Sequence, residues 1–322
     1  MYLSVAKVLN RLAYTQWTSI KYGLLKSNYG IIDKERIIDM YPNMIQKLTT
    51  PSAPKPAQKE IAPKSYTWYY PQNAKCVKRY IDMMDSPHLL IAGQTGSGKS
   101  TLLNGILYSA LAMKCPAEAM FVLIDVKHVE LSPYKKLPHV WKFVTEADDV
   151  PSVLHTINRY MDSEYTAMEQ AGIRKSTSTH IYIVIDELAD LLMSAHSRDI
   201  KYEMQRILQK GRAANIHIIA CTQSPSRKTL PAELVINFTN RIALPCVSAI
   251  ESRQIINKAG AEKLKGYGTA LYMSPMKEIE TLTGIPVFTD AEIKERIDFW
   301  VNQDGEEQDP RAYSDDVYIA FS

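Results

Sequence analysis

The sequence lacks the features of several protein classes. Its 322 residues contain only four cysteines, Cys76, Cys115, Cys221 and Cys246, and no C-x-x-C pair. This spacing excludes a disulfide framework or a zinc ribbon and favours a reducing compartment. No apolar run approaches the roughly 18 residues of a membrane helix, and residues 1–10 do not resemble a signal peptide. We therefore expect a soluble, cytoplasmic chain without a transmembrane segment.

An excess of charge of one sign is also absent. The chain has 38 basic and 35 acidic residues, a net charge of +3, which is too small to indicate a nucleic-acid binder by itself. The basic residues are unevenly distributed, because residues 1–92 hold 13 of them against 6 acidic residues. This portion is either a solvated surface or a functional basic arm. The seven histidines form no metal-ligand pattern such as H-E-x-x-H.

The chain divides into four predicted segments. Residues 1–50 show apolar positions at helical spacing and predict a small helical N-terminal region. Residues 51–65 contain four prolines, which favour an extended linker. Residues 66–302 predict a large folded domain. Residues 303–322 hold six acidic residues and one arginine, and predict a mobile acidic tail.

Short apolar runs alternate with amphipathic stretches in the large domain. The runs cover residues 89–92, 120–124, 181–185, 216–220 and 241–244. Continuous apolar strands separated by helices are typical of a parallel sheet that is buried on both faces. We therefore predict an α/β fold with a mostly parallel sheet covered by helices on both faces.

A glycine-rich segment directly follows the first apolar run. It reads Gly93-Gln94-Thr95-Gly96-Ser97-Gly98-Lys99-Ser100, the G-x-x-x-x-G-K-S pattern of a P-loop. Its glycines let backbone N–H groups converge on a phosphate, and the following helix directs its positive end there. An exposed Lys99 would reach the β- and γ-phosphates, and the Ser100 hydroxyl would bind Mg²⁺. Together with Thr101, the segment predicts an ATP site in a RecA-like P-loop NTPase.

Two adjacent acids end the run 181–185. Asp186 would hold Mg²⁺ through water as a Walker B residue, and Glu187 would polarise the attacking water as a general base. An acid pair at this place can also cap a helix N-terminus. The next apolar run leads to Gln223, which would contact the γ-phosphate or the attacking water, or would simply cap the strand.

Further residues carry a resemblance to a known family. The stretch from Ser86 to Asn302 resembles the FtsK/SpoIIIE DNA-translocase motor. Besides the P-loop, the similar segments are Ile124–Lys127, Glu130-Leu131, Tyr134, Pro138-His139, Gly211–His217, Ala220–Pro225, Ser252-Arg253, Ala259–Glu262 and Gly266–Gly268. This resemblance identifies residues 66–302 as the expected ATPase motor domain. No winged helix or other base-reading module is recognisable in the chain.

The resemblance implies a homo-oligomeric ring, usually hexameric, that threads double-stranded DNA and binds ATP between subunits. Arg212 matches the family position proposed to reach a neighbour's γ-phosphate, where it would stabilise transition-state charge. Spacing alone also allows a surface ion pair or a helix C-terminal cap for Arg212.

The expected function is therefore an ATP-dependent DNA translocase, acting in DNA transfer or segregation of a phage, plasmid or integrative element. The alternatives are an ATPase of this type that couples to protein export, or a nucleotide-gated adaptor of a conjugation complex. A membrane or nucleoprotein partner fits each of them.

Overall fold

The computed structural model describes most of the predicted large domain. The described residues are 68–72, 75–79, 83, 86–223, 225–227, 229–266, 268–275, 278–285 and 287–302. The predicted helical region 1–50, the linker 51–65 and the acidic tail 303–322 lie outside them.

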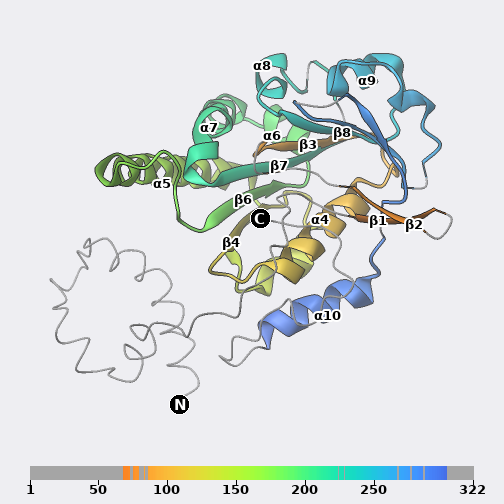
Figure 1. Ribbon diagram of the computed structural model, residues 1–322. Coiled ribbons are helices and arrows are strands. Elements are labelled where there is room, and N and C mark those ends of the chain that lie inside the picture. Colours follow the sequence, from red (N-terminus) through yellow and green to blue (C-terminus); the bar gives the residue numbers. More distant parts are fainter. Residues whose placement is uncertain are drawn as a thin grey trace. The chain divides into compact units, whose positions relative to one another are not determined.

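An eight-stranded sheet forms the centre of the fold (Figure 1). Its strands, in sequence order, are β3 (Leu89–Ala92), β4 (Ala119–Ile124), β5 (Val140–Val144), β6 (His180–Ile185), β7 (Ile216–Thr222), β8 (Asn240–Ala243), β9 (Ala270–Met273) and β10 (Glu280–Leu282). The spatial order is β10-β9-β8-β3-β7-β6-β4-β5. All pairings from β8 to β5 are parallel, whereas β9 pairs antiparallel with both β8 and β10. The predicted mostly parallel sheet is confirmed.

The helices lie on both faces of this sheet. They are α4 (Lys99–Met113), α5 (Val150–Ala171), α6 (Leu188–Met193), α7 (Ser197–Lys210), α8 (Ala232–Val235), α9 (Ala249–Ile256) and α10 (Asp290–Val301). Figure 1 shows α4 and α10 on one face and α5, α6 and α7 on the other. Short 3₁₀ helices are η1 (Ser132–Lys136), η2 (Ala147–Asp149), η3 (Gly211–Ala214) and η4 (Ala261–Lys263). A separate antiparallel hairpin joins β1 (Trp68–Gln72) to β2 (Lys75–Arg79).

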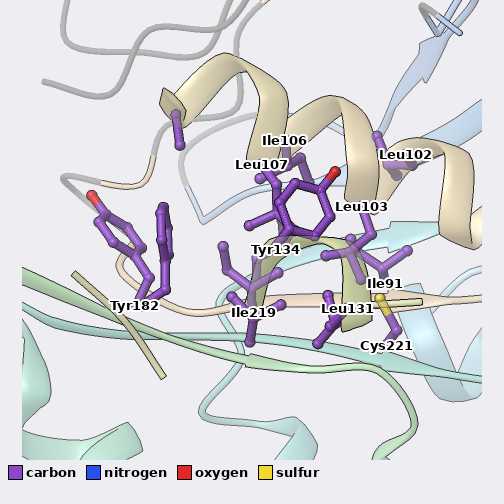
Figure 2. Packing of buried hydrophobic residues seen from close by; sticks show 14 of the residues in the cluster. Ile91, Leu102, Leu103, Ile106, Leu107, Leu131, Tyr134, Tyr182, Ile219 and Cys221 are labelled. Carbon is purple, nitrogen blue, oxygen red and sulfur yellow. The ribbon is translucent and has the colours of Figure 1, made fainter. Parts of the chain in front are cut away.

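Each face of the sheet has its own apolar core, because neighbouring residues of a strand point to opposite faces. In β3, Ile91 belongs to the core under α4 and α10, whereas Leu90 belongs to the core under α5, α6 and α7. Figure 2 shows the first core, with Leu103 and Ile106 of α4 above Ile219 of β7. The central strands are therefore buried from solvent on both faces, which explains the continuous apolar runs in the sequence.

All five predicted strands are present, with small differences at their ends. The structure adds β5, β9 and β10, which lie toward the two edges of the sheet. Polar residues interrupt two of these strands, Lys142 in β5 and Glu280 and Thr281 in β10, so a search for continuous apolar runs misses both. β9 is apolar throughout and fits the pattern, but it is not among the predicted strands.

The parallel register places three strand ends at one edge of the sheet. Ala92 at the end of β3 pairs with Thr222 at the end of β7, and Ile185 at the end of β6 pairs with Ala220. The residues that follow these strands are therefore neighbours in space, although they are far apart in the sequence.

Candidate active site

The predicted nucleotide-binding residues occupy one loop and one helix turn. Gly93, Gln94, Thr95, Gly96, Ser97, Gly98, Lys99, Ser100 and Thr101 all lie between the end of β3 and the first turn of α4. The N–H of Gly93 donates to the carbonyl of Thr222 (3.3 Å), and the N–H of Gln94 donates to the carbonyl of Pro245 (2.9 Å). Gly98 begins α4 with φ of 97°, a left-handed conformation that favours glycine. The loop is thus fixed to the ends of β7 and β8.

Lys99 turns back onto the loop that precedes it. Its ammonium group donates to the carbonyls of Gly93 and Gln94, at 2.8 Å each. The residue is 8% exposed, so the expectation of an exposed lysine is wrong. Burial lowers the pKa of Lys99, while the negative charge of Glu187 opposes this effect. The hydrogen bonds from the ammonium group to these two carbonyls replace the hydrogen bonds to water that Lys99 loses on burial.

Asp186 and Glu187 follow β6 and have different surroundings. Asp186 is half-buried. Burial first, and then the negative charges of Asp125 and Glu130, raise the pKa of Asp186 to about 6. Its free carboxyl group therefore titrates near neutral pH, and a nearby cation would favour the charged form.

Glu187 is 3% exposed, yet its carboxylate has several donors. The backbone N–H of Gln223 lies 3.1 and 3.2 Å from its two oxygens, and the Lys127 ammonium lies 3.3 Å from Oε2. The N–H of Ala189 donates to Oε1 at 3.4 Å, so Glu187 also caps α6. The helix-cap interpretation of Glu187 is thus correct, and it does not compete with a catalytic one because the carboxylate also faces the end of β7.

Gln223 connects the P-loop with the acid pair. While its backbone N–H donates to Glu187, its side-chain Oε1 accepts a hydrogen bond from the Thr95 hydroxyl at 2.7 Å. Three separate segments, the loop after β3, the end of β6 and the end of β7, therefore meet through one residue. This placement fits the proposed contact of Gln223 with a phosphate or the attacking water, which stays a prediction.

Lys127 and Glu130 join the same site, although the sequence pattern gave them no chemical role beyond the resemblance. Both follow β4, the strand beside β6. Lys127 pairs with Glu187 at 3.3 Å and with Asp190 at 3.6 Å. The Ser100 hydroxyl donates to Glu130 Oε1 at 2.5 Å. A sequence signal could have identified both residues: they are charged and follow an apolar strand that lies beside β6 in the sheet. Using this signal requires a prediction of the strand order.

The residues present fit a magnesium ion bound together with nucleotide phosphates. Ser100 and Asp186 offer hydroxyl and carboxylate oxygens, which Mg²⁺ prefers, and this ion keeps waters and substrate phosphates as further ligands. Among the described residues, no group of three or more His, Cys, Asp or Glu side chains could hold a metal by itself. The donor set therefore suits a shared metal–nucleotide site and not a closed metal cage.

Arg212 lies apart from the P-loop of its own chain. It is an exposed residue of η3, directly before β7 begins, whereas the P-loop follows the opposite ends of the strands. Arg241 and Arg253 are the arginines to consider next, if Arg212 does not make the contact in trans. Arg241 is buried and donates to the carbonyls of Phe238 (2.7 Å) and Ile255 (3.1 Å). Arg253 is exposed on α9. The structure thus brings Lys99, Ser100, Asp186, Glu187 and Gln223 together and leaves Arg212 outside.

Comparison with known proteins agrees with this arrangement. The P-loop and the central parallel sheet define a P-loop NTPase. A model of the FtsK/SpoIIIE family matches residues 54–183 and 177–227, which include every residue of the site. The chain therefore belongs to the FtsK/SpoIIIE family, and the resemblance noted from the sequence is confirmed.

Two curated relatives are DNA translocases by name. The chain is 38% identical over 213 residues to DNA translocase FtsK of Chlorobaculum tepidum, a match that covers 60% of this chain and 26% of that protein. It is 40% identical over 208 residues to DNA translocase SftA of Bacillus subtilis, which covers 60% of this chain and 22% of that protein. The matches thus span about a quarter of the relatives' lengths.

A solved structure confirms the fold. The pCW3 conjugation coupling protein TcpA, determined as a monomer with ATPγS, superposes with a TM-score of 0.59 and 21% identity. The match covers 83% of this chain and 87% of that one. Within the described part of the chain, no helix has both the length and the apolar character required to cross a membrane.

Proposed function

We propose that this chain is the ATPase motor of a double-stranded DNA translocase. The observation that carries the proposal is the meeting of P-loop, acid pair and Gln223 at one edge of the sheet, through the contacts of Gln223 with Thr95 and Glu187. Membership of the FtsK/SpoIIIE family supports the DNA substrate, because the curated relatives are DNA translocases by name.

The nucleotide would bind at the loop between β3 and α4. The backbone N–H groups of the loop and the N-terminus of α4 provide positive partial charge for phosphates. Lys99 would exchange its two carbonyl partners, Gly93 and Gln94, for phosphate oxygens. Mg²⁺, when bound, would neutralise phosphate charge. Ser100 and Asp186 are the residues that would hold it.

Glu187 would act as general base. Water attacks the γ-phosphorus, its proton passes to the Glu187 carboxylate, and the bond to the ADP oxygen breaks. The Gln223 N–H is shared between the two oxygens of this carboxylate, at 3.1 and 3.2 Å, which would set the direction of the carboxylate before substrate arrives. Lys127 pairs with the same carboxylate and would have to loosen this pairing for Glu187 to accept a proton.

Activity would depend on assembly. We propose a homo-oligomeric ring in which Arg212 reaches the nucleotide of a neighbouring subunit. The exposure of Arg212 and its distance along the sheet from the P-loop of its own chain support a role in trans. The ring would bind DNA, and a membrane or nucleoprotein partner would recruit it in the cytoplasm.

One assay tests the proposal directly. ATP turnover by the full chain is measured with and without duplex DNA of mixed sequence. We expect duplex DNA to stimulate turnover and the Lys99→Ala variant to be inactive in both conditions. Lys294→Ala, which removes an exposed lysine of α10, is the matched control and should behave like the unsubstituted chain.

Two results would contradict the proposal in different ways. Turnover that DNA does not change would remove DNA as the substrate and favour a motor for protein export. Turnover that survives in Lys99→Ala would show that this loop is not the ATP site.

A further inference from the structure

Glu130 makes a contact that the proposed function does not use. The Ser100 hydroxyl donates its proton to Glu130 Oε1, and the two oxygens lie 2.5 Å apart. Ser100 is the residue whose oxygen would bind Mg²⁺. The acceptor of its proton thus comes from the loop after β4, 30 residues further along the chain.

A buried carboxylate fixes the position of Glu130. Asp125 is completely buried and accepts hydrogen bonds from the N–H groups of Val129 (3.2 Å) and Leu131 (3.0 Å), the two neighbours of Glu130. It also accepts the Ser132 hydroxyl at 3.4 Å. Because the backbone is held on both sides of Glu130, its direction toward Ser100 is part of the folded structure.

The chemistry of a hydroxyl group gives this contact a consequence. A serine hydroxyl has one proton to donate and two lone pairs to share. When the proton points to a carboxylate, both lone pairs remain available for a metal, and the negative partner increases the electron density of the oxygen. We propose that Glu130 is a positioning residue that accepts the Ser100 proton and so directs the Ser100 oxygen toward Mg²⁺. This inference rests on the proposed nucleotide site.

Magnesium binding provides a readout that does not depend on turnover. Equilibrium binding of a fluorescent ATP analogue is measured while Mg²⁺ is titrated, which gives the Mg²⁺ concentration at half-maximal binding. We expect Glu130→Ala to raise this concentration about 10- to 100-fold, the usual effect of removing the partner of a metal ligand. Glu130→Gln keeps an acceptor oxygen and should have a smaller effect. In EDTA, which removes Mg²⁺, Glu130→Ala should bind the ATP analogue no more weakly than the unsubstituted chain, because the substitution removes a negative charge near the phosphates.

A matched control and a double variant separate positioning from general damage. Glu169→Ala removes an exposed carboxylate near the end of α5 and should leave the Mg²⁺ titration unchanged. Ser100→Ala alone should raise the Mg²⁺ requirement. If Glu130 acts through Ser100, adding Glu130→Ala to Ser100→Ala should change the requirement by less than about twofold.

The outcomes distinguish this inference from the proposed function. Additive effects in the double variant, or an unchanged titration in Glu130→Ala, would overturn the proposed role of Glu130 but leave the proposed nucleotide site standing. An unchanged titration in Ser100→Ala would instead overturn the nucleotide site on which the inference rests.

Discussion

The two adjacent acids that follow β6, for which we propose separate tasks, have different surroundings. Asp186 is half-buried among other acids, which raises its pKa to about 6, and it is thus suited to a cation. Glu187 is buried but has N–H donors and the Lys127 ammonium around it, so its charge is compensated without a metal. These surroundings are the physical reason why we propose the metal-binding role for Asp186 and the role of general base for Glu187.

This difference predicts different defects for the two amide variants. Glu187→Gln keeps an oxygen for the Gln223 N–H but loses the base, so it should bind ATP normally and hydrolyse it about 10²–10⁴-fold more slowly. Asp186→Asn should instead weaken Mg²⁺-dependent ATP binding. Binding constants and single-turnover rates measure both effects. Equal loss of binding in both variants would contradict the division of roles.

His139 shows how burial couples the fold to pH. It is completely buried, its Nε2 lies 2.9 Å from the carbonyl of Lys114, and its ring meets the Trp300 ring edge-on at 4.6 Å. Burial lowers the pKa of His139 to about 4, while the Lys114 carbonyl opposes this shift. The folded protein therefore contains a neutral ring where the unfolded chain, with a pKa near 6.5, takes up a proton more readily.

The sign of the pH effect follows. Below about pH 6.5 the unfolded chain binds more protons than the folded one, so stability falls as pH decreases toward about 4, the folded pKa of His139. Each such histidine contributes at most about 1.4 kcal/mol per pH unit. We expect His139→Gln, which retains an N–H donor, to reduce this slope in urea unfolding experiments between pH 4.5 and 7. An unchanged slope would exclude His139 as a contributor. The buried His88 and His217, whose pKa values burial also lowers, should maintain the remaining slope.

At the scale of elements, the strands determine which residues can cooperate within one chain. The P-loop follows the carboxyl end of β3, and η3 with Arg212 precedes the amino end of β7. Since β3 and β7 are parallel neighbours, these two features lie at opposite edges of the sheet. If Arg212 completes an active site, as we propose, that site would therefore belong to another subunit.

This arrangement predicts that two inactive variants rescue each other. Arg212→Ala retains its own Lys99, and Lys99→Ala retains Arg212, so mixed rings contain some interfaces with both residues. We expect partial recovery of DNA-stimulated ATPase activity after subunit exchange. No recovery in mixed rings verified by mass would exclude Arg212. Arg253, exposed on α9, would then be the next candidate, because the guanidinium of Arg241 is engaged inside the fold.

At the scale of the whole molecule, the charge is nearly balanced, at +3 for 322 residues. DNA binding would therefore depend on local basic surface and on assembly, not on a strong overall field. We recognise no base-reading motif within residues 66–302, so contacts with the phosphate backbone would supply the affinity of this domain for DNA.

Backbone contacts predict a strong dependence on salt and a weak dependence on sequence. Binding of duplex DNA releases counterions, so 6–10 phosphate contacts reduce affinity about 10³–10⁵-fold between 50 and 200 mM salt. We expect a decrease of this kind, and similar affinities for unrelated duplexes, in fluorescence anisotropy titrations with a non-hydrolysable ATP analogue present. Affinity that is independent of salt, or that requires one short sequence, would contradict backbone binding.

The sequence by itself determined the class of fold and the main parts of the site. Apolar runs identify the central strands because strands that are buried on both faces are mainly apolar. The P-loop pattern is specific because phosphate binding requires glycines, lysine and a hydroxyl group at fixed spacing. Asp186 and Glu187 were found because two acids directly follow such a strand. The edge strands β5 and β10 were missed because polar residues on their partly solvated faces interrupt the pattern. β9, which lies between β10 and β8, is apolar throughout and was missed although it fits the pattern.

Only the tertiary structure decided which distant residues meet. Ser100 and Glu130 are 30 positions apart, Lys127 and Glu187 are 60 apart, and Thr95 and Gln223 are 128 apart. Their contacts depend on the spatial order of β3, β7, β6 and β4, which differs from the order along the chain. The local sequence shows which functional groups a segment carries. Strand order and register determine which other segments those groups contact, because strands far apart in the sequence pair in the folded chain.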